Sequence, residues 1–98
     1  MRGNFWVYMV TNKTHTVLYT GVTNNLERRI WEHRHKTNPR SFAAIYSAHL
    51  LVWFEQFPTA LEAIAAEKSI KGRTRAKKDA MIQEMNPLWN DLSDGWFD

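Results

Sequence analysis

The beginning of the chain constrains the fold most, because it holds two strand-forming runs joined by a polar connection. Phe5–Val10 is a continuous aromatic and β-branched run, and Val17–Val22 is a second run of similar character. The polar residues Thr11–Thr16 separate them. Aromatic and β-branched runs are typical of buried strands, and two of them around a short polar connection indicate a β-hairpin. We therefore expect an antiparallel hairpin at the start of the fold.

Capping residues and helix breakers divide the next part of the chain. Asn24, with Glu27 three positions later, resembles an N-cap pair and predicts a helix over Asn25–Lys36. The run Asn38–Ser41 contains a proline and breaks this helix. The segment Phe42–His49 is compatible with either helix or strand.

A third strand and a second long helix follow. Leu50–Phe57 is mostly apolar and aromatic, which predicts the strand. Thr59 and Glu62 have the spacing of a capping box and mark a helix start. We expect this helix to end at about Lys71, since Gly72 is a natural stop.

The chain is one domain long. A last helix over Arg75–Met85 is predicted to end at Asn86 and Pro87, and Leu88–Asp98 is expected to pack loosely over the surface. With 98 residues, 44% of them hydrophobic, the chain has room for one core and not for two. The sequence predicts a single domain over residues 1–98. Its class is α/β (α+β), with a small three-stranded antiparallel sheet flanked by helices in the order β-β-α-β-α-α.

Two tyrosines of the hairpin, Tyr8 and Tyr19, are candidates for chemistry. Because side chains alternate between the faces of a strand, the two can stand side by side with their hydroxyls converging. Gly21 ends the second strand, where a missing side chain lets another backbone or a phosphate approach closely. The alternative is that both tyrosines are core residues whose hydroxyls reach water.

One face of the first helix offers two further candidates. Leu26, Arg29, Ile30 and His33 are spaced by three and four residues and so share this face. The two apolar members should pack on the sheet, which places Arg29 and His33 at the edge of the core. An arginine there can bind phosphate oxygens, and a histidine can bind a metal or move a proton. Alternatively, Arg29 pairs with a carboxylate and His33 covers a hydrophobic edge.

Glu67 lies on the apolar stripe of the second long helix. A carboxylate in such a place is unfavourable unless a cation meets it. The candidate partners are a divalent metal, Arg29, and Lys71, which would make an ordinary i, i+4 pair. Asn86 precedes Pro87 at a helix end, a common structural position for asparagine.

The positive charge is concentrated in one stretch. The formal net charge is +3, and of the 13 Lys and Arg residues six fall between Lys68 and Lys78, where there is no acid. Such a stretch favours a phosphate backbone as partner, although solvated helices can be equally basic. The six cations are Lys68, Lys71, Arg73, Arg75, Lys77 and Lys78.

The composition excludes several classes of protein. The chain has no cysteine, which rules out disulfides, zinc–thiolate sites and thiol catalysis. Phe5–Val10 is too short an apolar run for a signal peptide, and no run approaches the length of a membrane helix. We expect a soluble, cytoplasmic protein with no membrane partner.

Taken together, the candidate residues resemble the GIY-YIG nuclease family over about Phe5 to Trp89. The two motifs that name the family correspond to Trp6-Val7-Tyr8 and Tyr19-Thr20-Gly21, where Trp6 replaces the first glycine and Thr20 the central isoleucine. The chain is most similar to small single-domain bacterial members, which resemble the nuclease module of the excinuclease C subunit. The family positions on the later elements are matched by Leu26, Arg29, His33, Glu67 and Asn86.

The resemblance implies the GIY-YIG fold and a metal-dependent endonuclease that hydrolyses phosphodiester bonds in DNA. It implies one Mg²⁺ or Mn²⁺ ion, bound through Glu67, at the scissile phosphate. Arg29 would offset the negative charge of the phosphate. Tyr8 or Tyr19 would orient or deprotonate the attacking water, and a base of this kind needs a tyrosine pKa lowered by a cation such as Arg29, Lys13 or the metal.

The remaining family positions have supporting roles. His33 would relay a proton or contact the phosphate, and Asn86 would brace the site. The basic stretch would bind the nucleic-acid backbone without reading sequence, which favours selection by structure and a role in DNA repair or processing. RNA is the alternative substrate.

Two other functions are compatible with the sequence. The first is a catalytically inactive nucleic-acid-binding module of the same fold, which the altered glycine motif favours. The second is a protein-interaction domain that binds a partner through exposed aromatics such as Trp89 and Trp96.

Overall fold

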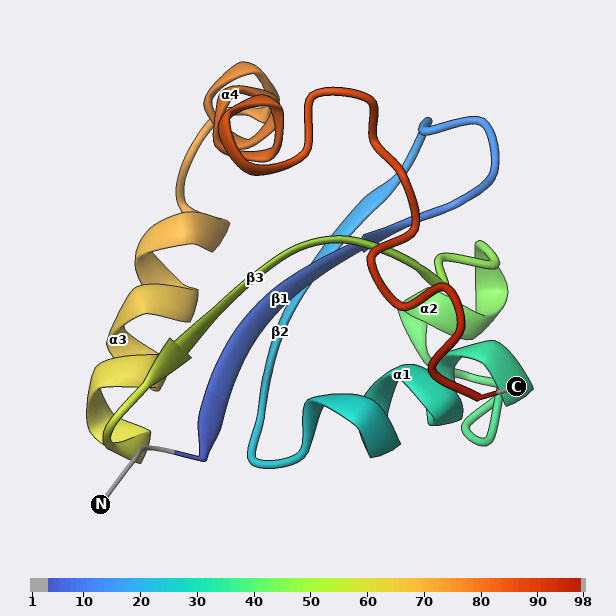
Figure 1. Ribbon diagram of the computed structural model, residues 1–98, viewed down its shortest axis with the longest axis horizontal. Coiled ribbons are helices and arrows are strands. Elements are labelled where there is room, and N and C mark those ends of the chain that lie inside the picture. Colours follow the sequence, from blue (N-terminus) through green and yellow to red (C-terminus); the bar gives the residue numbers. More distant parts are fainter. Residues whose placement is uncertain (1–3, 98) are drawn as a thin grey trace.

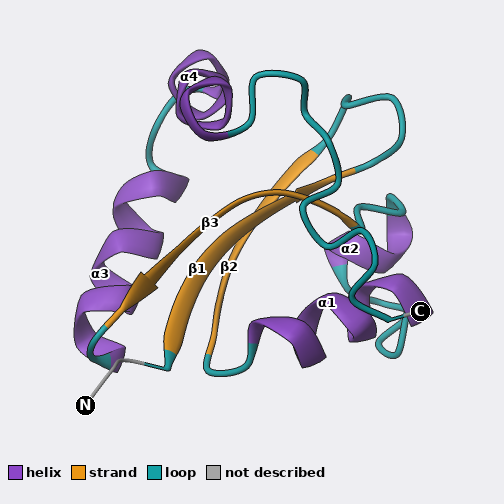
Figure 2. Cartoon of the chain, viewed as in Figure 1, coloured by secondary structure: helices purple, strands orange, loops and turns teal. Residues whose placement is uncertain are grey.

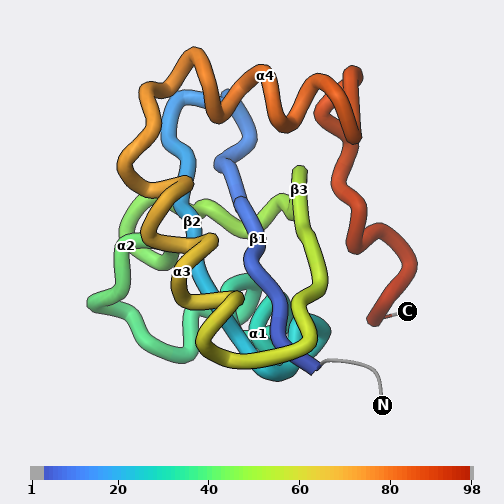
Figure 3. The backbone as a smooth tube through the Cα atoms, turned by 90° about the vertical axis from the view of Figure 1, so that its left-hand side faces the viewer, coloured from blue at the N-terminus to red at the C-terminus, as the bar shows by residue number. Residues whose placement is uncertain are grey.

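A three-stranded antiparallel sheet forms the centre of the molecule (Figure 1). The computed structural model describes residues 4–97, so residues 1–3 and 98 of the predicted domain lie outside the described part. The central strand is β1 (Phe5–Thr11), and β2 (Leu18–Thr23) and β3 (Leu50–Phe57) pair with it on either side. Figure 3 shows the strands in the order β2, β1, β3. The predicted hairpin and third strand are confirmed.

Helices cover both faces of the sheet (Figure 2). α3 (Ala60–Lys71) and α4 (Arg75–Met85) lie on one face, and α1 (Leu26–His35) and α2 (Phe42–Ile45) on the other. The predicted element order is confirmed, and α2 is an additional short helix in the segment that the sequence left open. None of the helices in the described part of the chain has the length and apolar character that a membrane span requires.

The alternation of β1 divides the core into two clusters. Val7 and Met9 face α3 and α4, where they pack in a cluster that includes Ile70. Tyr8 faces α1 and packs in a second cluster with Ile30. Val7, Tyr8, Met9 and Ile30 are all 0% exposed. A central strand that is buried on both faces explains the nearly continuous apolar run that opens the chain.

The helix starts follow their capping residues, with one correction. The side chain of Asn25 accepts a hydrogen bond from the Arg28 backbone N–H at 3.0 Å, so the N-cap of α1 is Asn25 and the expectation of Asn24 was wrong by one residue. Both are asparagines, and the backbone conformation that selects one of them is set by the turn after β2. The Thr59 cap of α3 is confirmed, since its hydroxyl accepts from the Glu62 N–H at 3.2 Å.

The C-terminal segment is bound firmly to the sheet, and the expectation of loose packing was wrong. The Leu92 N–H donates to the Leu51 carbonyl at 2.7 Å, and the Leu51 N–H donates to the Asp91 carboxylate at 3.2 Å. Ser93 is fully buried. Arg34 of α1 pairs with Asp91 at 2.7 Å. The segment therefore ties α1 to β3, a long-range contact for which the local sequence has no pattern.

The hairpin contains a buried hydroxyl that the fold leaves unsatisfied. Oγ1 of Thr20 has no hydrogen-bond partner among the described residues, although Thr20 is only 4% exposed. Replacing it with the isosteric Val removes the desolvation cost of this hydroxyl. We expect Thr20→Val to raise the free energy of unfolding by about 1 kcal/mol, measured by denaturant titration.

Thr11 provides the matched control on the same hairpin. It is also fully buried, but its hydroxyl donates to the Val17 carbonyl at 2.7 Å. Thr11→Val should therefore lower the free energy of unfolding by about 1 kcal/mol. Equal effects of the two substitutions would show that Thr20 is hydrogen-bonded in solution.

Candidate active site

The site is built on a close approach between the two hairpin strands. Tyr8 of β1 lies directly opposite Gly21 of β2 in the sheet register. A Cβ added at Gly21 would lie 2.6 Å from Cζ of Tyr8, well inside van der Waals contact. The Tyr8 ring therefore crosses the space that any other side chain at position 21 would fill. The close approach expected at Gly21 is present, but the group that approaches is the Tyr8 ring and not a backbone or a phosphate, so glycine is required at this position by the tyrosine.

This approach brings the Tyr8 hydroxyl to His33 of α1. The Tyr8 oxygen and His33 Nε2 are 2.9 Å apart. Burial, together with the positive charge of Arg29, lowers the pKa of His33 to about 4, so the imidazole is neutral at pH 7. Burial also raises the pKa of Tyr8, and the Arg29 guanidinium only partly opposes this shift. The contact is therefore between a neutral phenol and a neutral imidazole.

The two tyrosines differ in their access to solvent. Tyr19 stands beside Tyr8, with ring centroids 6.3 Å apart, and its ring lies 5.7 Å from that of His33. Tyr19 lines an open pocket of about 240 Å³, whereas Tyr8 is 0% exposed behind it. The pocket is lined by Tyr19, Arg29, Glu32, His33, Thr37, Asn38 and Ser41.

Arg29 and His33 project into this pocket from the predicted face of α1. Leu26 and Ile30 of the same face are buried, which holds the polar pair at the edge of the core. Nε of Arg29 lies 3.1 Å from Oε1 of Glu32, so the expected alternative of a carboxylate partner is present. Burial alone would lower the pKa of Arg29, but its interactions with Tyr8 and Glu32 raise it, and the guanidinium stays charged.

Sequence reasoning missed Glu32 as a pocket residue. It lies three residues after Arg29 and directly before His33, a spacing that already placed it within reach of the guanidinium. Its carboxylate also lies 3.9 Å from Arg28. Glu32 is therefore the acidic partner of the Arg29 guanidinium in this pocket.

Glu67 lies on α3 with 14% of its side chain exposed. Its Oε2 is 2.8 Å from Nζ of Lys71, the ordinary i, i+4 pair. This hydrogen bond raises the pKa of Lys71, whose ammonium lies 5.8 Å from the centroid of the Tyr19 ring. Glu67 thus reaches the edge of the site through Lys71, and it is not one of the described residues that line the pocket.

A hard divalent ion needs few protein ligands when a phosphate is present. Within residues 4–97, no three or more His, Asp or Glu side chains gather into a group that could hold a metal ion. Mg²⁺ is commonly held by one or two carboxylates, with water and phosphate oxygens completing its coordination. A single, largely shielded carboxylate such as Glu67 fits this donor set, provided that the half-exposed Lys71 ammonium gives way.

Comparison with known proteins identifies the family. The sequence profile described as the GIY-YIG catalytic domain matches residues 4–80. The chain belongs to the GIY-YIG family. A UPF0213 protein of Haloquadratum walsbyi is 34% identical over 84 residues, which cover 86% of this chain and 92% of that protein. A UPF0213 protein of Vibrio parahaemolyticus is 31% identical over 77 residues, or 79% of this chain and 71% of that one.

A solved structure supports the same assignment. The solution NMR structure of a UPF0213 protein from Bacillus halodurans matches this chain with a TM-score of 0.56 and 26% sequence identity. The match covers 93% of this chain and 96% of that chain. The predicted GIY-YIG fold is confirmed. Trp6, at the first glycine of the motif, keeps the regular pairing of β1 and packs its ring 5.8 Å from that of Phe54.

Asn86 lies outside the segment that the GIY-YIG profile matches, and the structure does not bring it to the pocket. Its Nδ2 donates to the carbonyls of Val52, at 3.2 Å, and Asn90, at 2.7 Å. Its Oδ1 accepts from the Asn90 N–H at 3.0 Å. The side chain joins the end of α4 to β3 and the C-terminal segment.

The six cations of the basic stretch divide into two groups. Lys71 binds Glu67, Arg73 contacts the Met81 sulfur at 3.0 Å, and Arg75 pairs with Asp79 at 2.8 Å. Arg75 also donates to two carbonyls of the β1–β2 connection. In the described part of the chain, no ion pair engages the other three cations, which are Lys68, Lys77 and Lys78.

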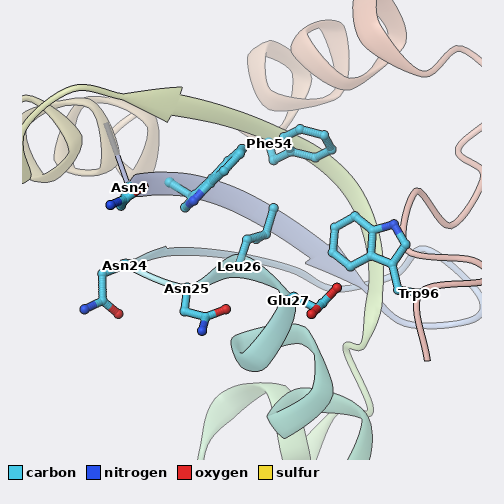
Figure 4. A pocket seen from close by; sticks show the side chains of 8 residues that line it. Asn4, Asn24, Asn25, Leu26, Glu27, Phe54 and Trp96 are labelled. Carbon is cyan, nitrogen blue, oxygen red and sulfur yellow. The ribbon is translucent and has the colours of Figure 1, made fainter. Parts of the chain in front are cut away.

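A second hollow, of about 340 Å³, lies at the start of α1 (Figure 4). Leu26, Phe54 and Trp96 form its apolar walls. Glu27 is the one ionisable group among the described residues that line it. A phosphate there would meet a carboxylate and no cation. The pocket beside Tyr19, which Arg29 and His33 also line, is the candidate active site.

The contact between Tyr8 and Gly21 predicts a steric effect of substitution. Because Tyr8 is fully buried, its ring can make room for a Cβ at position 21 only by disturbing the packing around it. Gly21→Ala should lower the free energy of unfolding by about 1–3 kcal/mol and displace the phenol from His33. In the control Gly72→Ala, the added Cβ would meet only carbonyl oxygens at 3.6 and 3.7 Å, so we expect a change below about 0.5 kcal/mol. Similar losses in both variants would contradict this account.

The lowered pKa of His33 predicts a loss of stability in acid. The unfolded chain takes up a proton near pH 6.5, whereas the folded protein takes it up only near pH 4. Stability should fall as the pH is lowered through this window and be unaffected by this group above it. Between pH 7 and pH 4, we expect the free energy of unfolding of wild type to fall by about 1–2 kcal/mol more than that of His33→Gln. This range is smaller than the full pKa shift would give, because part of the ring is exposed to water. Parallel pH profiles of unfolding would contradict the assignment.

Proposed function

We propose that the pocket beside Tyr19 hydrolyses phosphodiester bonds in nucleic acid, with DNA as the substrate. The observation that carries this proposal is the convergence of Tyr19, Arg29 and His33 on one open pocket, in a chain of the GIY-YIG family. Endonucleases characterise this family. The proposal assigns their chemistry to this chain.

Arg29 provides the phosphate contact. Its guanidinium is partly exposed in the pocket and charged, and its planar fork suits two oxygens of a phosphate. Glu32 holds this fork in the absence of substrate. When a phosphate binds, it replaces the Glu32 carboxylate as the anionic partner of Arg29. The partly buried guanidinium is therefore never left without a negative partner.

His33 is the proton acceptor, and its basicity depends on the substrate. In the protein alone, burial and, after it, the positive charge of Arg29 keep the imidazole neutral and weakly basic. A phosphate beside Arg29 brings negative charge, which favours the imidazolium and raises the pKa of His33 towards neutrality. With Nε2–H donating to the Tyr8 oxygen, Nδ1 of His33 is the free acceptor. It can then take the proton of a water that attacks phosphorus, while the bond from phosphorus to the leaving oxygen breaks and that oxygen departs as an oxyanion, which takes a proton from solvent.

The two tyrosines have different roles in this scheme. Tyr19 faces the pocket, so its hydroxyl orients the attacking water. Tyr8 is buried, its pKa is raised, and it contacts Nε2 of His33, so it fixes the orientation of the imidazole. Of the two tyrosines that the sequence left open as a base, Tyr8 does not have the lowered pKa that this role needs. Burial outweighs the nearby cation.

Glu67 is the residue that would hold a Mg²⁺ or Mn²⁺ ion, which supplies charge neutralisation for the phosphate and the leaving oxygen when bound. In this structure Lys71 pairs with the Glu67 carboxylate and compensates its negative charge. The exposed cations after Glu67 add backbone affinity without sequence readout, so we infer selection by nucleic-acid structure and a role in DNA processing or repair.

One observation favours a second candidate function. The ion pair between Glu67 and Lys71 leaves the protein without a free carboxylate at this position. If Lys71 holds the carboxylate permanently, the molecule is a nucleic-acid-binding module that retains the GIY-YIG fold without cutting. In this second candidate function, Arg29 still binds the phosphate of a nucleic acid, but Glu67 holds no metal ion.

Glu67→Gln separates the two functions. The substitution preserves the shape of the side chain and removes the charge that a metal requires. We expect it to reduce metal-dependent nicking of supercoiled plasmid and branched DNA by at least about a hundredfold, with binding in EDTA retained. The control Glu62→Gln changes an exposed carboxylate on the same helix and should cut as wild type does.

The outcomes distinguish the proposals. Nicking by Glu67→Gln at the wild-type rate would overturn the metal role of this carboxylate. Wild-type protein that binds DNA but does not nick it in Mg²⁺ or Mn²⁺ would support the binding module. In each case, circular dichroism of the variants checks that the fold is intact.

A further inference from the structure

α2 buries its small residues and exposes its large ones. Ala43 and Ala44 are 1% and 6% exposed. Phe42, Ile45 and Tyr46, in contrast, are 42%, 62% and 50% exposed. A helix that served only to close the core would have the opposite arrangement, because burial of a large apolar side chain is worth more than burial of an alanine. The exposed aromatic groups therefore point to a binding role.

The aromatic rings of Phe42 in α2 and of Tyr46, the C-cap of α2, continue the wall of the candidate active-site pocket. The Phe42 ring stacks on Tyr19, with centroids 5.8 Å apart and planes inclined by 26°. The Tyr46 ring follows at 4.7 Å from Phe42. Ser41, the N-cap of α2, itself lines the pocket. A row of three rings thus runs from the pocket onto the surface.

Cations flank the inner end of this row. Nζ of Lys71 lies 5.8 Å from the centroid of the Tyr19 ring, and Arg29 lines the same pocket. Positive charge beside exposed aromatic faces is the combination that proteins use to bind single-stranded nucleic acid, in which cations follow the phosphates and rings stack on the bases.

We propose that Phe42 and Tyr46 form a stacking platform for an unpaired nucleobase next to the phosphate held in the pocket, and that this platform makes the protein selective for single-stranded nucleic acid. The position of that phosphate rests on the proposed nuclease function. Bases in a duplex are stacked on one another and cannot present a face to the platform. Single strands and flaps can, with little dependence on sequence, because every base has an aromatic face.

The test is a binding measurement in EDTA, where no cutting occurs. A single-stranded oligonucleotide that carries one 2-aminopurine reports stacking through quenching of its fluorescence, and a blunt duplex of the same sequence gives the reference affinity. We expect Tyr46→Ala and Phe42→Leu each to weaken single-strand binding by about five- to hundredfold and to reduce the quenching. Duplex affinity should remain unchanged.

Trp31→Ala is the matched control. Trp31 is 43% exposed and stacks on a neighbouring side chain, as Phe42 does, but it lies on α1 and does not line the pocket. Its removal should change neither affinity. Phe42→Leu keeps an apolar contact with Tyr19 while removing the aromatic face, so a loss of binding in this variant is not a loss of folding. The half-exposed Tyr46 gives the second, independent variant.

Wild-type single-strand affinity in both platform variants would overturn the inference. An equal loss for duplex and single strand would overturn it as well, because it would indicate general electrostatic binding. Sedimentation can also show that wild type dimerises and Tyr46→Ala does not. That result would assign Phe42 and Tyr46 to self-association and would likewise overturn the inference. Failure of the nuclease proposal is recognised separately: the wild-type protein would not cut, while the two variants would still lose quenching.

Discussion

The contact between the Tyr8 ring and the backbone of Gly21 is the constraint on which the rest of the site depends. The ring crosses the neighbouring strand because nothing occupies the side-chain position of Gly21. Only from there does the hydroxyl reach Nε2 of His33, one turn beyond Arg29 on α1. The contact therefore fixes the hairpin and the first helix relative to each other. Arg34 lies on the same helix and anchors it to the C-terminal segment through its ion pair with Asp91.

Local pattern was sufficient for most of the fold and for the inner part of the site. Strand alternation predicted that Tyr8 and Tyr19 stand together, and helical spacing predicted that Arg29 and His33 share an edge of the core. The strand Leu50–Phe57 has the predicted bounds. Each of these features is decided by residues close in sequence or by a period of two or about four residues.

The parts that were not predicted depend on contacts between distant segments. The C-terminal segment is held by Leu51 and Arg34, which lie far away in the chain. The short helix α2 forms because Ser41 caps it and its alanines fit the core, although its sequence alone is ambiguous. The pKa of Tyr8 depends on the balance between burial and one cation, which composition does not reveal.

The charged groups around the pocket are arranged as pairs in the absence of substrate. Glu32 holds Arg29, and Lys71 holds Glu67. Neither pair is part of a buried network, because each includes a partner that is about one-third or more exposed. Such pairs are weak enough to be exchanged at little cost. A phosphate can replace Glu32 on the arginine, and a divalent ion can replace Lys71 on the carboxylate.

This exchange links binding to proton transfer. Burial and, after it, the positive charge of Arg29 hold the pKa of His33 at about 4, and Tyr8 contacts the imidazole in its neutral form. With the guanidinium neutralised by a phosphate, the charge that opposes protonation of His33 is removed, while burial, the larger cause of its low pKa, remains. In the proposed function, a bound phosphate would therefore make His33 a better proton acceptor than it is in the protein alone. The same anion would place the adjoining nucleotide over Phe42, so recognition and activation would depend on a single binding event.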